Sequence, residues 1–452
     1  MKNPLLLISI VSGLILLQFS ASAQDSIEKK KGKIPTGFSF GALPIVSFDA
    51  DLGFQYGGLV NLYDYGDGSI YPQYKHMLKL EVSRYTKGSG INDLFYDSKY
   101  LLPKNIRITA DLGYLTDKLF DFYGYNGYQS VYNSTYVDKA DTGYVTSIFY
   151  RYERKLFRFT ADLQGKLYGD HLRWVGGIAF ISVKAGAVDT ASLNQKKDEG
   201  DKLPYTSNLY DLYVDWNLLS PAERDGGTAN FLKMGLVYDS RDNEASPTKG
   251  IWSEALLVYS PGFLFNSEFS FTKLVLIHRQ YFTVLHNKLT FAYRLGYQST
   301  IGGGHAPYYF ESYLVSSFSA STKPDGLGGA KTLRGILRNR VVGDGVAYGN
   351  FELRWKFLQT HVGKANLYFG LDGFFDVGKV VRPFGIDENK IPEQDRNVYF
   401  NFTYQNDKLH PSAGGGLRVA LNENFILAVD YGFALNKQDG LKGLYISVGN
   451  LF

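Results

Sequence analysis

The sequence predicts an all-β fold: a transmembrane antiparallel β-barrel of about 16 strands with a long extracellular loop folded into the lumen. From Gly349 to Phe357 the even positions are polar or charged and the odd positions are apolar apart from the glycine, so one face suits oil and the other water. The segment 444–452 stops on Phe452, as expected when the last strand closes a membrane barrel. Composition agrees, because 35 Tyr, 32 Phe and 49 Gly accompany a slightly negative mean hydropathy, which polar lumen-facing positions would produce.

Charge and cysteine content exclude several functional classes. The formal net charge of +4 is small and no basic run is interleaved with aromatic residues, so no nucleic acid is expected as a partner. The absence of cysteine excludes disulfides, thiolate catalysis, zinc–thiolate sites and a lipoprotein anchor. No spacing of His and carboxylate residues is distinctive, so we expect no metal and no cofactor.

The first residues have the features of a targeting segment. Lys2 precedes an apolar stretch from Leu5 to Leu17, and Ala21-Ser22-Ala23 forms a small-residue cleavage site. Because that stretch is shorter than the roughly 20 residues needed to cross a bilayer, we expect a cleaved signal peptide rather than an anchor helix. The expected organisation is a signal peptide at 1–23, a short polar periplasmic N-terminus at 24–36 and the barrel at 37–452.

Sixteen segments have the pattern of a barrel strand, and bacterial barrels prefer an even number. The first is expected at about Leu52 to Tyr63, after a segment from Gly37 to Phe48 that would line the barrel entrance. The others are centred near 76–85, 95–102, 106–115, 144–152, 157–167, 173–183, 231–241, 251–259, 270–284, 288–299, 347–357, 366–379, 413–420, 424–433 and 444–452. A soluble β-sandwich would also alternate, but this many Tyr and Phe on so many strands would overfill its one core.

Three long polar inserts interrupt the strands, at 188–208, 302–345 and 382–411. Barrels of this class have short periplasmic turns and longer outer loops, so tracing from an N-terminus inside the cell envelope places all three outside the cell. Their charges are most simply solvated loop surface.

The second insert contains the candidate functional residues. Arg334 lies within it, and Glu352 and Asp376 fall on the polar, lumen-facing sides of the two strands that follow. An arginine on a loop tip is ordinarily exposed to solvent, but two carboxylates side by side in a confined lumen need a cation. A guanidinium that folds inward would bind both in charge-assisted bonds of roughly 1.5 to 3 kcal/mol each and would hold the loop inside the barrel.

These residues resemble a known family. Leu333-Arg334-Gly335-Ile336 is similar to the hydrophobic-Arg-Gly-aromatic loop motif of the BamA/TamA-type superfamily of outer-membrane assembly barrels, also called the bacterial surface antigen family. Ile336 stands where the motif has Phe or Tyr, which weakens the packing part of the motif but not the ion pair. Phe375-Asp376-Val377-Gly378 resembles the partner segment, and Glu352 sits where a second acidic partner is expected. The turn around 238–250 and the segments 414–418 and 430–432 also fit, so the resemblance runs from about residue 231 to residue 452.

The resemblance implies a barrel that is closed weakly between its first and last strands and opens sideways into the bilayer. An edge strand with unpaired amide groups would template an incoming strand by backbone hydrogen bonding. Candidate seam glycines, which would reduce packing there, are Gly53 and Gly57 in the expected first strand and Gly449 in the last. Family members that assemble or export proteins carry periplasmic domains, which residues 24–36 are too few to form, so a minimal member without POTRA domains is implied.

Three function classes stay open. The leading hypothesis is a non-enzymatic barrel that inserts, assembles or translocates proteins or lipids at the outer membrane of a Gram-negative bacterium. Its expected partners are the outer-membrane lipid bilayer, client outer-membrane proteins and a separate periplasmic or lipoprotein partner. The alternative is a passive channel or structural barrel plugged by its inward loop. A barrel enzyme would need Ser or a carboxylate next to His at the bilayer boundary, and the seven His are scattered without a companion motif.

Overall fold

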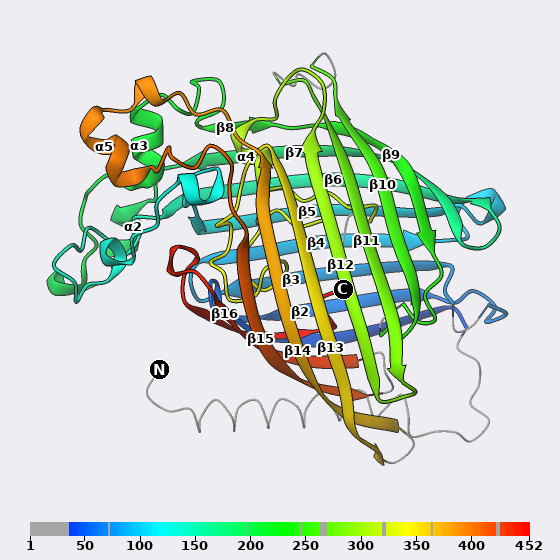
Figure 1. Cartoon of the computed structure of the whole chain (residues 1–452). Coiled ribbons are helices and arrows are strands. Elements are labelled where there is room, and N and C mark those ends of the chain that lie inside the picture. The colour runs from blue at the N-terminus through cyan, green and yellow to red at the C-terminus, as the bar shows by residue number, and fades with distance from the viewer. Residues whose placement is uncertain are drawn as a thin grey trace.

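The backbone forms one antiparallel sheet that closes on itself into a barrel (Figure 1). The computed structural model describes residues 36–70, 73–195, 197–244, 246–262, 269–318, 322–362, 365–421 and 425–452. In these ranges the sheet has 17 strands, of which β8 (Gly226–Thr228) is a short addition beside β7, so 16 strands form the wall. They are β1 (Phe38–Asp49), β2 (Gly53–Asp64), β3 (His76–Tyr85), β4 (Ser89–Ser98), β5 (Arg107–Asp121), β6 (Arg151–Tyr168), β7 (Leu172–Gly186), β9 (Phe231–Asp239), β10 (Gly250–Ser260), β11 (Phe271–Leu285), β12 (Leu289–Thr300), β13 (Gly345–Val362), β14 (Ala365–Arg382), β15 (His410–Leu421), β16 (Phe425–Ala434) and β17 (Lys442–Val448).

The helical segments are short and lie in the connections between strands. The α-helices are α2 (Thr190–Asn194) and α3 (Leu209–Asp215) between β7 and β8, α4 (Tyr308–Glu311) between β12 and β13, and α5 (Glu393–Tyr399) between β14 and β15. The 3₁₀ turns are Pro103–Asn105, Gly127–Gln129, Ser134–Val137, Glu199–Asp201, Glu388–Lys390 and Lys437–Asp439. Within the described ranges, no helix is both long enough and apolar enough to cross a membrane.

Each wall strand presents one face outward and one face inward, because successive side chains of a strand point to opposite sides. In β13, Leu353, Trp355 and Phe357 are exposed, whereas the intervening Glu352 and Arg354 are buried. Charged side chains thus line the interior, and aliphatic and aromatic side chains cover the outside. This is the arrangement that a barrel in lipid requires.

The predicted number of strands is confirmed, but two of the predicted segments were wrong in opposite directions. The segment 37–48, which we expected to line the entrance, is the wall strand β1, and it pairs along its whole length with β2. The segment 144–152 is not a strand until Arg151, where β6 begins. One missed strand therefore offsets one false strand.

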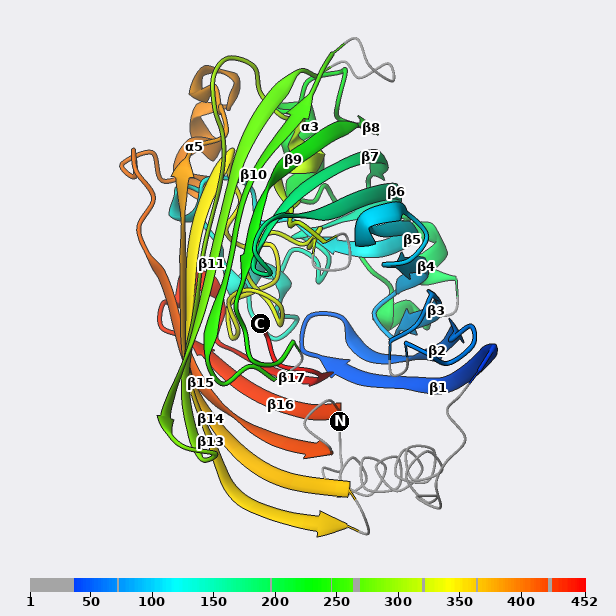
Figure 2. The ribbon, with the colours of Figure 1, turned by 90° about the vertical axis from the view of Figure 1, so that its right-hand side faces the viewer.

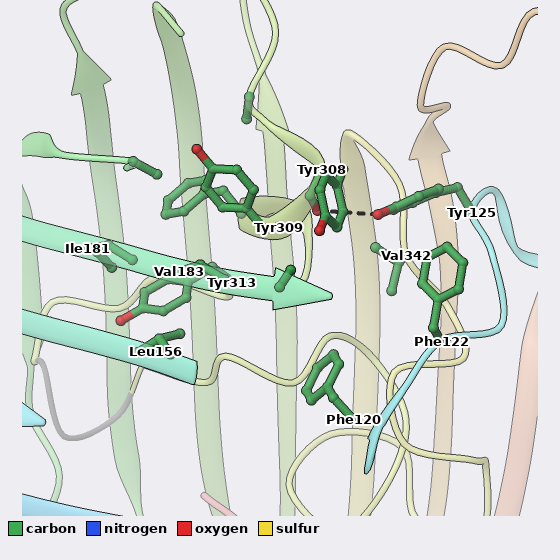
Figure 3. Packing of buried hydrophobic residues seen from close by; sticks show 14 of the residues in the cluster. Phe120, Phe122, Tyr125, Leu156, Ile181, Val183, Tyr308, Tyr309, Tyr313 and Val342 are labelled. Carbon is green, nitrogen blue, oxygen red and sulfur yellow. Dashed lines mark hydrogen bonds between the residues drawn. The ribbon is translucent and has the colours of Figure 1, made fainter. Parts of the chain in front are cut away.

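Phe149, Tyr150 and Tyr152 of the segment 144–152 belong to a core beneath the long connections. Phe149 is 2% exposed, and its ring centroid lies 5.1 Å from that of Tyr136. Figure 3 shows the adjoining part of this cluster, where the Tyr125 hydroxyl donates a hydrogen bond of 3.4 Å to the backbone oxygen of Tyr308. The prediction failed here because a short apolar run has the same composition in a buried loop as in a strand.

The four longest connections all lie at one end of the barrel. An antiparallel chain returns to the same end at every second connection, so the connections 122–150, 187–230, 301–344 and 383–409 share one end, called the loop end below. The opposite end, called the turn end, carries three-residue connections such as 169–171 and 286–288. The three inserts that we predicted to share a side therefore do so, and 122–150 joins them.

The seam that closes the barrel is short. β1 pairs with β17 through two residue pairs, Phe48 with Ile446 and Asp49 with Tyr445, whereas β1 pairs with β2 over all 12 of its residues. Both seam pairs lie at the loop end of β1. Within the described residues, the stretch of β1 from Phe38 to Ser47 consequently has no strand partner on its seam side.

Two of the three candidate seam glycines do not lie in the first strand. Gly53 and Gly57 belong to β2, because the segment before them is itself a wall strand. At Gly57 a Cβ atom would lie 2.3 Å from the backbone oxygen of Val82, so this glycine serves the contact between β2 and β3. Gly449 follows the last residue of β17 and has a φ of +91°.

The seam register predicts a disulfide in the double variant Phe48→Cys/Ile446→Cys. The chain has no cysteine of its own, and residues directly opposite on antiparallel strands have Cβ atoms about 4.5 to 5.5 Å apart, close to the range that a disulfide needs. Non-reducing electrophoresis of outer membranes would measure the cross-link. The pair Phe48→Cys/Leu444→Cys, two residues out of register, serves as the control, and an equal yield from that pair would contradict the register.

Candidate functional site

The connection between β12 and β13, residues 301–344, enters the barrel and is called the lumen loop below. Leu333, Arg334 and Ile336 of the predicted motif have 0% exposed surface. The tip of an outer loop would ordinarily meet water. Complete burial of these side chains, among wall residues of β13 to β17, places the tip inside the lumen.

Arg334 binds three carboxylates. Its Nη1 lies 2.8 Å from Oε1 of Glu352 and 3.5 Å from Oδ2 of Asp430, and its Nε lies 2.9 Å from Oδ2 of Asp376. Its backbone N–H also donates to Asp376, at 3.0 Å. Burial alone would lower the pKa of the Arg334 guanidinium, but Asp376 and Glu352 raise that pKa above its ordinary value, so the group stays charged. The structure thus brings together the arginine and the two acids singled out in the sequence.

The register of the wall explains why the two acids lie side by side. Asn350 of β13 pairs with Asp376 of β14, and Glu352 pairs with Phe374, so both carboxylates point into the lumen one step apart. The Asn350 side chain donates to Asp376 at 2.8 Å and to the backbone oxygen of Thr332 at 2.6 Å. This amide therefore ties the loop to the wall without adding charge.

Two residues of the site were not indicated by the sequence. Asp430 of β16 supplies the third carboxylate, and Phe374 of β14 places its ring centroid 3.6 Å from the guanidinium carbon of Arg334. A guanidinium over an aromatic face is favourable, more so in a site without water. Because Ile336 lacks the aromatic ring of the resembled motif, the aromatic contact of Arg334 comes from the wall. Alternation along β14 puts Phe374 on the same side as Asp376, and that pattern could have indicated it.

Two further arginines extend the ion-pair network along the wall. They are Arg354, 2.7 Å from Glu352, and Arg418, 2.7 Å from Asp430 and 3.0 Å from Asp372. With Arg334, three guanidinium groups face four carboxylates, and the Arg294 side chain lies close by, hydrogen-bonded to Asn350. Taking one such charge out of water costs several kcal/mol unless it is paired. Each member of the network therefore depends on the others.

Two glycines let the tip of the lumen loop lie directly on β16. Gly335 has a φ of +92°, and a Cβ atom there would lie 2.5 Å from the backbone nitrogen of Phe433. A Cβ atom at Gly432 would lie 2.7 Å from the carbonyl carbon of Arg334. The Gly335 N–H donates to the Tyr445 hydroxyl of β17 at 3.2 Å, so the motif also contacts the last strand. Side chains at these two positions would lift the loop from the wall.

The lumen loop is also held on the opposite part of the wall. Arg338 of the loop and Arg154 of β6 both bind Asp117 of β5 and Asp325 of the loop, at 2.8 to 3.4 Å. Burial alone would raise the pKa of the Asp325 carboxyl, but Arg338, with help from Lys331 and Arg154, holds that pKa well below its ordinary value. The loop is therefore fixed by buried charge pairs at two separate places.

A third attachment lies on β9 to β11. Lys273 of β11 lies 2.6 Å from Glu311 in α4 and 3.4 Å from Asp344 at the end of the loop. Lys233 of β9 donates to the backbone oxygens of Ser316 and Ser317 at 2.9 and 3.1 Å. Because the lumen loop is attached to three parts of the wall, it forms a fixed plug in the lumen and is not hinged at one side.

Phe452 does not lie in a strand, so the expectation that it ends the closing strand was wrong. β17 stops at Val448, and Phe452 is 8% exposed, packed with Tyr281 and Ala292 on the inner wall. In Figure 2 the label for this end of the chain lies within the ring of strands. The positive φ of Gly449 explains the departure, because it turns the chain off the path of the strand.

The arrangement suits a structural or mechanical role. Within the described ranges, no group of three His, Cys, Asp or Glu side chains is placed to hold a metal ion. The charged groups around Arg334 form ion pairs with one another, as described above. What the site does chemically is to fix a loop to the last five strands of the wall.

Arg334→Ala should loosen the lumen loop and lower the stability of the barrel. Removing one partner from a buried ion pair costs about 3 to 5 kcal/mol, because it leaves the opposing carboxylates uncompensated. We expect a lower temperature for the loss of heat-modifiable mobility on semi-native gels and faster proteolysis within residues 301–344. The double variant Arg334→Ala/Asp376→Asn should recover part of the loss, because one uncompensated charge is gone.

The matched control is Arg224→Ala, which removes an arginine whose side chain is 47% exposed, in the 187–230 connection. It should leave the transition unchanged. Equal transitions for Arg334→Ala and the unaltered protein would contradict the burial of this ion pair.

Comparison with known proteins supports a common fold and a family. Two solved structures have similar backbones: BamA from Haemophilus ducreyi lacking POTRA domains 1–3, at 14% identity and a TM-score of 0.54 over 92% of this chain and 70% of that one, and CdiB from Escherichia coli, at 10% identity and a TM-score of 0.52 over 92% of this chain and 63% of that one. At these identities the likeness shows the fold alone. No curated protein matches the sequence significantly. The model of the Omp85 superfamily domain, however, matches residues 104–452, which is most of the chain, and this outer-membrane β-barrel therefore belongs to the Omp85 superfamily.

Proposed function

We propose that this Omp85 barrel inserts, assembles or translocates client proteins at the outer membrane by opening between β1 and β17. The observation that carries the proposal is the seam of two residue pairs in an otherwise continuously paired wall. The prediction that the protein is not an enzyme agrees with the superfamily, whose members are assembly or transport barrels.

The unpartnered stretch of β1 provides a strand edge to which a client strand can hydrogen-bond. Phe38 to Ser47 expose backbone groups on the seam side, and each unpaired group in hydrocarbon costs several kcal/mol. The outward face of this stretch is apolar, with Phe38 and Phe40 76% and 77% exposed. A strand that pairs with β1 would satisfy the backbone groups, and β-augmentation of an open edge is a general mode of peptide recognition.

Opening the seam would break fewer interactions than clearing the lumen loop out of the barrel. Opening the seam breaks two residue pairs. Clearing the lumen would break the contacts of Arg334 on β13 to β16, of Arg338 on β5 and of Lys273 on the loop, all of them buried ion pairs. A lateral route is therefore favoured over a passive pore, which was the alternative interpretation.

The position of the two seam pairs gives the opening a direction. Both lie at the loop end, so the seam is open toward the turn end. In outer-membrane barrels the long loops face the outside and the short turns face the periplasm. A client would then enter from the periplasm, as expected if residues 1–23 are a signal peptide that is removed on export in a Gram-negative bacterium.

Delivery of the client is assigned to a separate partner. A periplasmic protein or lipoprotein is the proposed partner, and client outer-membrane proteins are the proposed cargo.

The cross-linkable variant Phe48→Cys/Ile446→Cys tests the lateral mechanism. Cells depleted of the unaltered protein should lose particular outer-membrane proteins, and the oxidised variant should fail to restore them because the disulfide holds the seam closed. Addition of a reductant should restore the missing proteins, measured by quantitative proteomics of outer membranes. Either single cysteine variant is the control. An unchanged outer-membrane proteome on depletion would sink the proposal.

A plugged barrel should conduct poorly. In planar bilayers the purified protein is expected to show only rare, small conductance steps, because the lumen loop is fixed at three places on the wall. Arg334→Ala/Arg338→Ala should raise the frequency and size of the steps. Large, steady conductance from the unaltered protein would instead favour the passive channel.

A further inference from the structure

We propose that the lumen holds a binding site for a phosphate group, formed by Lys323 and Lys331 of the lumen loop. Both side chains line a cavity of about 180 Å³ between the loop and strands β3 to β6. The ligand class is a small tetrahedral oxyanion, either free phosphate or the phosphate group of a larger molecule. The site does not include the seam residues of β1 and β17, and its existence can be tested without any client protein.

The aspartates around this cavity are already bound by cations of the wall and the loop. Arg158 of β6 lies 3.0 Å from Asp93 of β4 and 2.6 Å from Asp111 of β5, and Lys79 of β3 lies 3.4 Å from Asp93. The two aspartates in the attachment of the loop to β5 and β6 are each bound by two arginines, as described above. Each aspartate that lines the cavity therefore has a counter-ion.

Lys323 and Lys331 have no such counter-ion. In the described part of the chain, no carboxylate forms an ion pair with either ammonium group, and the adjacent residues 319–321 contain no acidic side chain. Glu81, the remaining carboxylate of the cavity, accepts a hydrogen bond from Ser83 at 3.0 Å. Two cations of the cavity are thus left for a ligand to pair with.

The backbone on both sides of Lys323 is held in place. The Lys323 N–H donates to the backbone oxygen of Leu314 at 3.0 Å, and the Lys323 carbonyl accepts from the Leu314 N–H at 2.7 Å. The next residue, Pro324, accepts a hydrogen bond of 2.6 Å from Arg154 through its backbone oxygen. The ammonium group of Lys323 therefore has only the freedom of its own side chain, and the site is preorganised for an anion.

The surroundings of Lys323 favour its charged form only when an anion is present. Burial, together with the nearby charges of Lys331 and Arg294, lowers the pKa of the Lys323 ammonium to about 7, and Asp325 offsets only part of this effect. A bound dianion would raise that pKa, because an opposite charge favours the protonated form. Anion binding and protonation of Lys323 are therefore coupled, so the affinity should fall as the pH rises above the pKa of the free site.

The chemistry and size of the cavity suit a phosphate group. Each ammonium group has three N–H donors and acts as a compact positive charge, which is how lysine binds phosphate. The cavity volume is many times the roughly 10 to 15 Å³ that one water needs, so a ligand can displace water without moving side chains. Lys331 is exposed although residues 332–336 are buried, so the ligand can reach this side of the cavity from water.

Calorimetric titration of the whole protein in an uncharged detergent tests the site, with sulfate and inorganic phosphate as probes. Each probe should bind at one saturable site, and Lys323→Met and Lys331→Met should each weaken binding by roughly tenfold, because each removes one of the two charges that face the anion. Lys139→Met, which removes a 51% exposed lysine in the 122–150 connection, is the matched control and should change neither affinity. Retained heat-modifiable mobility shows that each variant is folded.

The pH dependence of sulfate binding separates a ligand-binding role of Lys323 from a structural one. Sulfate keeps its charge near neutral pH, so its affinity for the unaltered protein should fall by on the order of tenfold between about pH 6 and about pH 8.5, as Lys323 loses its proton. Lys323→Arg, whose guanidinium stays charged, should still bind sulfate and should lose most of this pH dependence.

Competition against sulfate identifies the source of the phosphate group. Glycerol 3-phosphate represents a soluble ligand, and a short-chain phosphatidic acid represents a lipid headgroup. Displacement of sulfate by either compound supports the site, and the tighter competitor identifies the source.

Two results would overturn the site. One is the absence of saturable binding of both sulfate and phosphate to the unaltered protein at about pH 6, where Lys323 is protonated. The other is an equal affinity for sulfate in the unaltered protein, Lys323→Met and Lys331→Met, since the anion would then bind elsewhere. Neither result depends on whether the barrel handles client proteins.

Discussion

The structure depends on one constraint: in a lipid layer a strand edge has no water to pair with, so a membrane sheet must close on itself. This chain closes a wall of 16 strands over two residue pairs. The remaining edge of β1 is left without a strand partner at the turn end. The other distinctive features of the molecule, the fixed plug and the inward-turned tail, lie around this incompletely closed seam.

Buried ion pairs hold the lumen loop to the wall, whereas only two residue pairs hold the seam between β1 and β17 within the described residues. Arg334, with its three carboxylates, fastens the lumen loop to β13, β14 and β16, and the Gly335 N–H reaches Tyr445 on β17. Buried ion pairs of this kind add little net stability compared with an apolar core, but breaking one partner is costly. They therefore specify where the loop sits more than they stabilise the barrel. In the lateral mechanism proposed above, this fixed loop would hold the last strands in place while β1 moves away.

Period-two alternation indicated from sequence alone that this is a barrel and that Glu352 and Asp376 face the lumen, because those features follow from which face each residue occupies. The contact of Arg334 with these acids was inferred from the need to pair two carboxylates, and the count of 16 strands was right only because one missed strand offset one false one. The position of β1, the loop character of 144–152 and the inward path of Phe452 were decided by the tertiary structure. Alternation does not tell whether an apolar run packs on lipid, on a loop core or in the lumen. It also fixes no register between strands that are distant in sequence, and the seam between Asp49 and Tyr445 joins nearly opposite ends of the chain.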